Sequence, residues 1–254
     1  MLSVVLLMRF YDGSDFASTA LPEHPEIILP GDLLFQDLRC GPLCDAIKAV
    51  THGVDGANFA HIAMVTRVDD DGTVWVIEAV SAGVVENTLD DLLARSRDDA
   101  GRPPVLLGRL TPEFEPLIPE AIAHAQSFLG LPYDAIYEME SDAFYCSELI
   151  YEAFRLANDG TPLFTLEPMT FQKPGSDATF AAWVDHYDAL DVPIPEGEPG
   201  LNPAGMSREP FVAIVHAYGR PDGYDGPVGA PTSFLRKQES RINRHSCEGR
   251  NPAE

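Results

Sequence analysis

Phe144-Tyr145-Cys146-Ser147-Glu148-Leu149-Ile150 is the stretch that decides the fold, because it places a cysteine where a helix begins. Asn158-Asp159-Gly160 downstream supplies residues that end a helix through a left-handed conformation. In the first turn, the helix dipole and unpaired backbone amides favour the thiolate, which is the nucleophilic form of cysteine. The alternative is that Cys146 is a small buried hydrophobic residue. Between Cys146 and Asn158, apolar residues recur at helical spacing: Leu149, Ile150, Ala153, Phe154 and Ala157.

The composition is that of a globular protein with one large domain or two small ones. The 254 residues are 45% apolar and carry a formal charge of −23 at pH 7. So acidic a chain disfavours nucleic acid and anionic membrane surfaces as partners, and it favours a neutral or cationic ligand. No stretch approaches the roughly 18 apolar residues that span a bilayer, so we expect no stable membrane insertion. The sequence does not predict the oligomeric state.

The four cysteines are Cys40, Cys44, Cys146 and Cys247. The spacing of Cys40 and Cys44 differs from the Cys-x-x-Cys of a zinc site or redox pair, so we expect neither a structural zinc nor a disulfide framework. Sparse cysteines, and a short apolar N-terminus without a basic lead-in, favour a cytoplasmic protein. A true start codon upstream would instead make the protein periplasmic or exported.

The chain divides into three parts. We expect residues 1–29 to form an N-terminal strand and connection, residues 30–231 a folded domain, and residues 232–254 a basic tail. The tail resembles a translated bacterial intergenic repeat and has no apolar periodicity, so we expect it to be disordered and without a catalytic role. Strands and helices alternate only in part within residues 30–231, which favours an α+β domain with an antiparallel sheet.

The clearest strand signal is a pair of segments, 61–68 and 73–80, around the turn Asp69-Asp70-Asp71-Gly72. With a two- or four-residue loop, paired positions sum to an odd number near 141. His61 and Glu78 then share one sheet face and lie within about 5–8 Å. A three-residue loop would put them on opposite faces. Glu78 interrupts an apolar run, where a carboxylate is costly unless it is paired. Taken singly, each residue also has a structural explanation, as a strand-end histidine and a solvated glutamate.

Five segments, taken in order, resemble the permuted papain-like, NlpC-type cysteine amidases and peptidases, the YiiX/YebB-like group. They are Gly31-Asp32-Leu33-Leu34-Phe35, His61-Ile62-Ala63-Met64-Val65, Ile77-Glu78-Ala79, Leu131-Pro132-Tyr133-Asp134 and Tyr145-Cys146-Ser147-Glu148-Leu149-Ile150. In that family the histidine and glutamate strands precede the cysteine helix, the reverse of papain's order. The resemblance covers roughly residues 30–218. It implies a circularly permuted papain-like fold, an antiparallel sheet or half-barrel packed against helices, with residues 30–231 as the catalytic domain.

The resemblance also assigns roles to residues. Cys146 would be the nucleophile, His61 the general base and acid, and Glu78 the residue that orients His61. The implied reaction is hydrolysis of an amide bond, in a cell-wall peptide or an N-acyl compound, through a thioester and without a metal or organic cofactor. Contacts to the oxyanion or the substrate are assigned to the Cys146 amide and, more loosely, to three side chains: Gln36, Tyr133 and Tyr145.

Two alternatives stay open. A non-catalytic ligand-binding module on the same fold would leave Cys146 unactivated. An acyltransferase would use the same Cys146 and His61 pair beside an apolar trench. The superfamily's lipid acyltransferases carry an Asn-Cys-Glu-His-Phe block, whereas this chain has Tyr-Cys-Ser-Glu-Leu, which weakens that second alternative. We expect Asp32 to be a structural turn or cap residue, and residues 160–205 to form long loops around the cleft.

Overall fold

The computed structural model describes residues 28–139 and 142–229, so the predicted tail and nearly all of residues 1–29 lie outside the described part. Its centre is a six-stranded sheet in the order β4-β3-β2-β1-β5-β8, and every neighbouring pair is antiparallel. The strands are β1 (Leu33–Gln36), β2 (His61–Val68), β3 (Val74–Val80), β4 (Gly83–Thr88), β5 (Val105–Leu110) and β8 (Val212–Ala217). The predicted α+β class with an antiparallel sheet is therefore confirmed.

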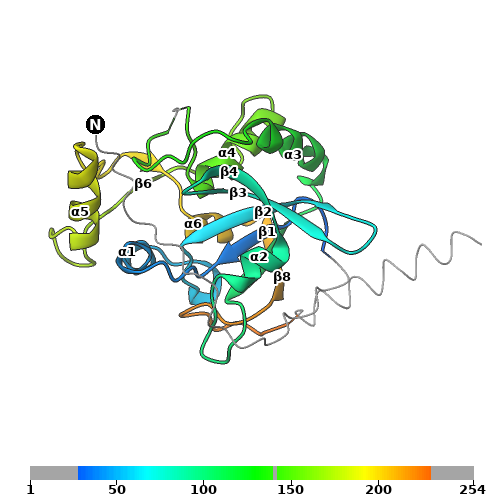
Figure 1. Ribbon diagram of the computed structural model, residues 1–254, viewed down its shortest axis with the longest axis horizontal. Coiled ribbons are helices and arrows are strands. Elements are labelled where there is room, and N and C mark those ends of the chain that lie inside the picture. Colours follow the sequence, from blue (N-terminus) through cyan, green and yellow to red (C-terminus); the bar gives the residue numbers. More distant parts are fainter. Residues whose placement is uncertain (1–27, 140–141, 230–254) are drawn as a thin grey trace, which may run out of the picture.

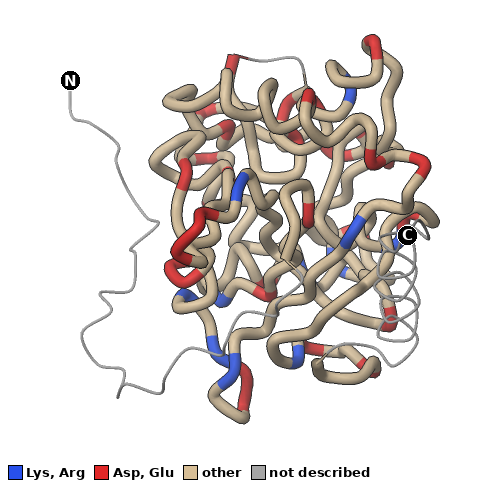
Figure 2. Tube along the Cα trace, turned by 90° about the vertical axis from the view of Figure 1, so that its right-hand side faces the viewer, with Lys and Arg blue, Asp and Glu red and all other residues tan. Residues whose placement is uncertain are grey.

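Six α-helices surround this sheet in the described part of the chain (Figure 1). They are α1 (Pro42–Val50), α2 (Leu89–Ala94), α3 (Ile118–Ser127), α4 (Cys146–Ala157), α5 (Ala181–Leu190) and α6 (Pro203–Ser207). Short 3-10 helices lie at Val54–Gly56 and Glu115–Leu117. Asp and Glu residues are spread along the tube in Figure 2. The whole sequence has 40 Asp and Glu against 17 Lys and Arg, which gives the formal charge of −23.

The sheet carries a hydrophobic core on each face, because successive strand residues point to opposite sides. Phe35, Met64 and Ile77 pack on one face with apolar residues of α3 and α4. Leu34 and Val76 pack on the other face with the leucines of α2. The sheet is thus covered by helices on both faces, with α4 buried against β2 and β3 along its predicted apolar stripe.

A β-bulge fixes which face His61 and Glu78 share. Near the turn, Val68 pairs with Val74, which leaves a five-residue loop, so the predicted loop length is wrong. The numbers of paired residues there sum to an even number, which would put His61 and Glu78 on opposite faces. The register then shifts at Thr66, and Met64 pairs with Ile77 in the predicted odd register. Because one inserted residue reverses the side-chain alternation, the bulge restores the predicted shared face.

Residues 160–205, which were expected to form long loops, also contain short strands and helices. The two-residue strands β6 (Glu167–Pro168) and β7 (Pro199–Gly200) pair with each other, and α5 lies in the excursion between them. Phe171, Trp183 and Tyr187 pack this excursion against α1. Within the described residues, no helix has the length and apolar character needed to cross a bilayer.

Cys40 and Cys44 are joined by a disulfide, which the sequence analysis did not predict. The bond spans the start of α1, where Gly41 precedes Pro42 and the two Cα atoms lie 5.4 Å apart. That separation lies within the range that a disulfide bridges. A spacing of four residues matches neither a zinc nor a redox motif, but the turn at the start of a helix brings two such residues together.

Candidate active site

Cys146 is the first residue of α4, as the sequence predicts. The preceding Tyr145 is extended, so the chain turns into the helix at the cysteine itself. The first-turn amides of a helix have no partner within the helix, and the dipole there favours a negative charge. Cys146 is 7% exposed and is the one free cysteine among the described residues. Its thiol is therefore buried, at a helix start whose amides and dipole favour the thiolate.

His61 lies between Cys146 and Glu78. It is the first residue of β2, and its Nε2 lies 2.6 Å from Oε2 of Glu78, which stands diagonally across on β3. The Cys146 thiol and the His61 ring also interact, since each shifts the pKa of the other. Since Nε2 faces Glu78, Nδ1 is the ring nitrogen left for the sulfur. The structure thus brings together the three residues that the sequence analysis grouped.

Glu78 has further partners that the sequence analysis missed. Its carboxylate accepts hydrogen bonds from Asn87 Nδ2 at 2.7 Å and from both terminal nitrogens of Arg95, with Arg95 Nη1 2.6 Å from Oε2. Asn87 lies on β4, next to β3, and Arg95 caps the C-terminal end of α2. The one signal in the sequence was that a carboxylate inside an apolar run needs a partner, and this signal does not say which residue supplies it.

Charge is stabilised along this row of groups despite its burial. Burial favours neutral His61, but bonds to Cys146 and Glu78 outweigh it and raise the His61 pKa to about 9. Burial also favours the neutral thiol, yet the interaction with His61 lowers the pKa of Cys146 below its ordinary value. Likewise, burial raises the pKa of Glu78, and Arg95 and His61 together bring it well below its usual range. The arrangement therefore shifts all three groups toward their charged forms, which are thiolate, imidazolium and carboxylate.

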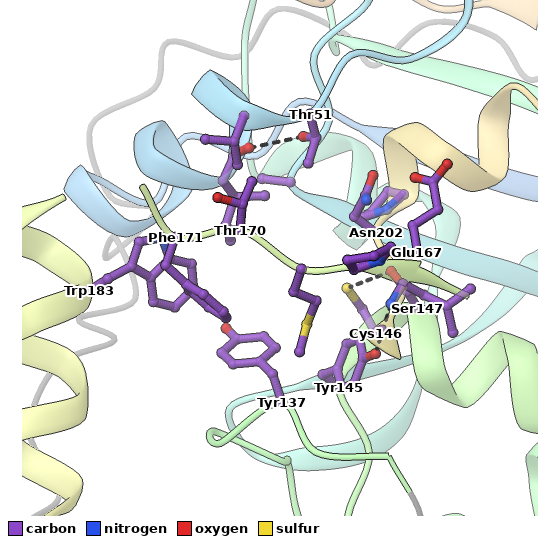
Figure 3. A pocket seen from close by; sticks show the side chains of 18 of the residues that line it. Thr51, Tyr137, Tyr145, Cys146, Ser147, Glu167, Thr170, Phe171, Trp183 and Asn202 are labelled. Atoms are coloured by element: carbon purple, nitrogen blue, oxygen red, sulfur yellow. Dashed lines mark hydrogen bonds between the residues drawn. The ribbon is translucent and has the colours of Figure 1, made fainter. Parts of the chain in front are cut away.

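A pocket of about 150 Å³ opens at Cys146. Figure 3 shows Cys146 and Ser147 on one side and the rings of Phe171 and Trp183 on the opposite side. Its walls come from α1, from the loop before α4, and from the segments around β6, β7 and α5, and they are more apolar than polar. Such a pocket suits a ligand with apolar and aromatic complementarity beside a few polar contacts.

The three side chains that were assigned more loosely differ in position. Tyr133 and Tyr145 line the pocket. The Tyr145 hydroxyl accepts a hydrogen bond from the Leu201 amide at 3.1 Å and donates to Met139, so it is already engaged. Gln36 is fully buried, and its Nε2 donates to the Leu92 carbonyl at 2.8 Å. The structure does not bring Gln36 to the pocket.

Tyr133 is the better placed of these for a polar contact. Its hydroxyl lies 3.4 Å from the hydroxyl of Tyr137, which also lines the pocket. Burial raises the pKa of Tyr137 to about 12, so this phenol remains a neutral donor at physiological pH. Asp134, in contrast, accepts bonds from the amides of Ile136 and Glu138 and so holds the loop before α4.

The described residues contain no group of three or more His, Cys, Asp or Glu side chains that could hold a metal ion. Residues 28–216 match a family model described as the permuted papain-like amidase enzyme, YaeF/YiiX, C92 family. A similar solved structure is that of the metalloprotein yiiX from Escherichia coli O157:H7. It is 24% identical with a TM-score of 0.58, over 76% of this chain and 98% of that one. No curated protein matches the sequence significantly. The fold predicted from the sequence is confirmed.

Proposed function

Since this chain belongs to the permuted papain-like amidase family of the YaeF/YiiX type, we propose that it is a cysteine hydrolase that cleaves an amide bond. The observation that carries the proposal is the buried row of Cys146, His61 and Glu78, in which Cys146 also lines a pocket. A thiolate at a helix start, a histidine beside it and a carboxylate behind the histidine are the parts that nucleophilic acyl transfer needs.

In the proposed first half-reaction, the Cys146 thiolate attacks the amide carbonyl and forms a tetrahedral intermediate. Its oxyanion is stabilised by the Cys146 backbone amide, with Tyr133 as a candidate second donor. The imidazolium of His61 then gives its proton to the amine as the carbon–nitrogen bond breaks, which leaves a thioester. Glu78 holds the ring in place and stabilises its positive charge until that transfer.

In the second half-reaction, neutral His61 takes a proton from water, and the resulting nucleophile attacks the thioester. Collapse of the second tetrahedral intermediate releases the acid and restores the thiolate–imidazolium pair. The substrate that we propose is a small-molecule or peptide amide, such as a cell-wall peptide or an N-acyl compound. The apolar pocket walls favour an apolar group near the scissile bond.

A second candidate is an acyltransferase that passes the acyl group to an acceptor other than water. The observation that favours it is the same largely apolar pocket beside Cys146, which would hold an acceptor and exclude water. Product analysis with an amide substrate separates the two. A free acid indicates hydrolysis, whereas an acyl adduct of an added amine or alcohol indicates transfer.

The first test is the rate at which iodoacetamide alkylates Cys146 as a function of pH. A Cys247→Ser background leaves Cys146 as the one reactive thiol while the Cys40–Cys44 disulfide is intact. We expect rapid alkylation well below pH 8, and in His61→Ala a fall of about 10²-fold at pH 6, because the imidazolium that stabilises the thiolate is gone. His124→Ala on α3 is the matched control and should leave the profile unchanged.

Slow alkylation with an ordinary thiol profile in both proteins would overturn the hydrolase proposal. The remaining reading would then be a non-catalytic ligand-binding module on the same fold. Loss of stability in His61→Ala, measured by urea unfolding, without loss of thiol reactivity would lead to the same conclusion.

A further inference from the structure

We infer that Arg95 and Asn87 are positioning residues that keep Glu78 ionised and fixed in the orientation in which it supports His61. The inference rests on the proposed function and assigns work to two residues outside the Cys146–His61–Glu78 row. Neither residue touches the thiol, and both act through the carboxylate.

The geometry fills every strong acceptor position of the carboxylate. Oε1 of Glu78 accepts from Asn87 and from Arg95 Nη2, while Oε2 accepts from Arg95 Nη1 and from His61. A bidentate arginine fixes the plane of a carboxylate as well as its position. Glu78 is completely buried, so no solvent molecule shares this task at its surface. The carboxylate is therefore held in one orientation before any substrate arrives.

The backbone explains why these residues meet. Glu78 pairs with Val85 across the β3–β4 ladder, and Asn87 lies two residues further along β4 on the same face. The chain then enters α2, whose six residues return Arg95 to the level of the carboxylate. The helix begins with Thr88, whose hydroxyl accepts from the Asp91 amide at 3.2 Å, so its start is fixed as well. One continuous segment, residues 85–95, thus forms the wall behind Glu78.

Electrostatics gives Arg95 a second effect. With Arg95 present, the buried row alternates in sign, from guanidinium to carboxylate to imidazolium to thiolate, and sums to zero. Without it the same row carries a net negative charge in a buried place, which favours uptake of one more proton. Removal of a cation raises the pKa of every acid nearby, so the thiolate should then form only at higher pH.

The experiment measures the pH profile of Cys146 alkylation by iodoacetamide in Arg95→Gln, Arg95→Lys and Asn87→Ala, all in the Cys247→Ser background. For Arg95→Gln we expect the acid limb of the profile to move up by about one pH unit, which is an approximately tenfold lower rate at pH 5.5. Arg95→Lys keeps the charge and should keep the acid limb near its original pH, with a lower rate at the plateau. Arg67→Gln is the control. It removes the same charge, but from an arginine that binds Glu86 and not Glu78.

A merely structural role for Arg95 would lower the rate equally at all pH values, or not at all, and either result overturns the inference. If Arg95→Gln does not fold, as judged by circular dichroism, Asn87→Ala tests the inference instead. It removes one hydrogen bond to Glu78 and keeps every charge. There we expect a roughly two- to fivefold lower rate at pH 5.5, and an unchanged rate overturns the inference. An ordinary thiol profile in the wild-type protein would instead count against the proposed function. An activated wild type with an unshifted Arg95→Gln profile counts against this inference alone.

Discussion

Two buried carboxylates of this sheet are each held by an arginine fork, and one of them also binds a histidine. Asp32, just before β1, accepts from Arg109 Nε and Nη2, both at 2.7 Å, and from the Leu29 amide. Glu78, on β3, accepts from Arg95, Asn87 and His61. Asp32 lies beyond the opposite end of β1 from the residue that pairs with His61. The fold thus uses the same pair twice, at two ends of the sheet.

The two carboxylates differ in the direction of their pKa shifts. For Asp32, burial outweighs the bonds to Arg109 and raises its pKa. For Glu78, burial also raises the pKa, but Arg95 and His61 outweigh it and lower the pKa. A buried carboxylate with an arginine is therefore not by itself a sign of an active site. The sign is a further cationic partner, here a histidine that also contacts a thiol.

The largest difference between the two carboxylates should appear when each is replaced in turn by its neutral amide. In Glu78→Gln the bond between the charged carboxylate and the imidazolium is lost. Such a bond contributes about 1.5–3 kcal/mol, so alkylation of Cys146 at pH 6 should fall roughly 10- to 100-fold. In Asp32→Asn we expect the alkylation rate to stay at the wild-type value, while urea unfolding shows a loss of about 3–5 kcal/mol, because a buried ion pair is broken. Equal losses of alkylation in both variants would contradict this division.

The pH dependence should sharpen the same contrast. His61 must be protonated to release the amine, and its pKa of about 9 places the upper limit of hydrolysis there, with about a tenfold loss per unit above it. Because this folded pKa exceeds the unfolded value near 6.5, His61 contributes stability that is complete below about pH 6.5 and is lost as the pH rises through 9. Among the residues that the structure describes, the partners of the Asp32 carboxylate are Arg109 and the Leu29 amide, and not a histidine.

NMR titration of the ring protons of His61 measures this limit directly. We expect the His61 resonance to titrate near pH 9, and that of His216 on β8 below the ordinary histidine value, because burial lowers the pKa of His216. Cys146→Ser should lower the His61 value, since one of the two stabilising bonds is weakened. A His61 titration near pH 6.5 in the wild type would show that neither the thiolate nor Glu78 holds its proton.

Local patterns were enough to predict the parts of the site that depend on one segment. The apolar stripe after Cys146 predicted α4, because burial of one face imposes the helical period on the sequence. The alternation identified the hairpin, and a two- or four-residue loop was expected to place His61 and Glu78 on one face. They do share a face, but the bulge at Thr66 and not the loop length produces that result. A bulge leaves no clear mark in an alternating sequence, since the apolar pattern continues on both sides of it.

Contacts between segments could not be predicted in the same way. Arg95 reaches Glu78 only because α2 is short enough to return it to the sheet. Nothing in the sequence distinguishes Arg95 from the other arginines as the partner of Glu78. Gln36 was expected near the oxyanion, but its amide turns to the Leu92 carbonyl across the α2 side of the sheet. The direction of a buried side chain depends on partners that are distant in sequence, which a single sequence does not specify.

A third carboxylate gives the mildest test of the comparison, because it is partly exposed. Glu86 accepts from Thr66, Arg67 and Gln126, and these bonds outweigh burial and lower its pKa. Its contribution to stability should be present above the unfolded value near pH 4.3 and lost as the pH falls. Solvent screens the pair, so Glu86→Gln should cost about 1 kcal/mol in urea unfolding at pH 7 and leave Cys146 alkylation unchanged. A fall in alkylation would mean that any carboxylate–arginine pair near this sheet supports the thiolate, and the special place of Glu78 beside His61 would be lost.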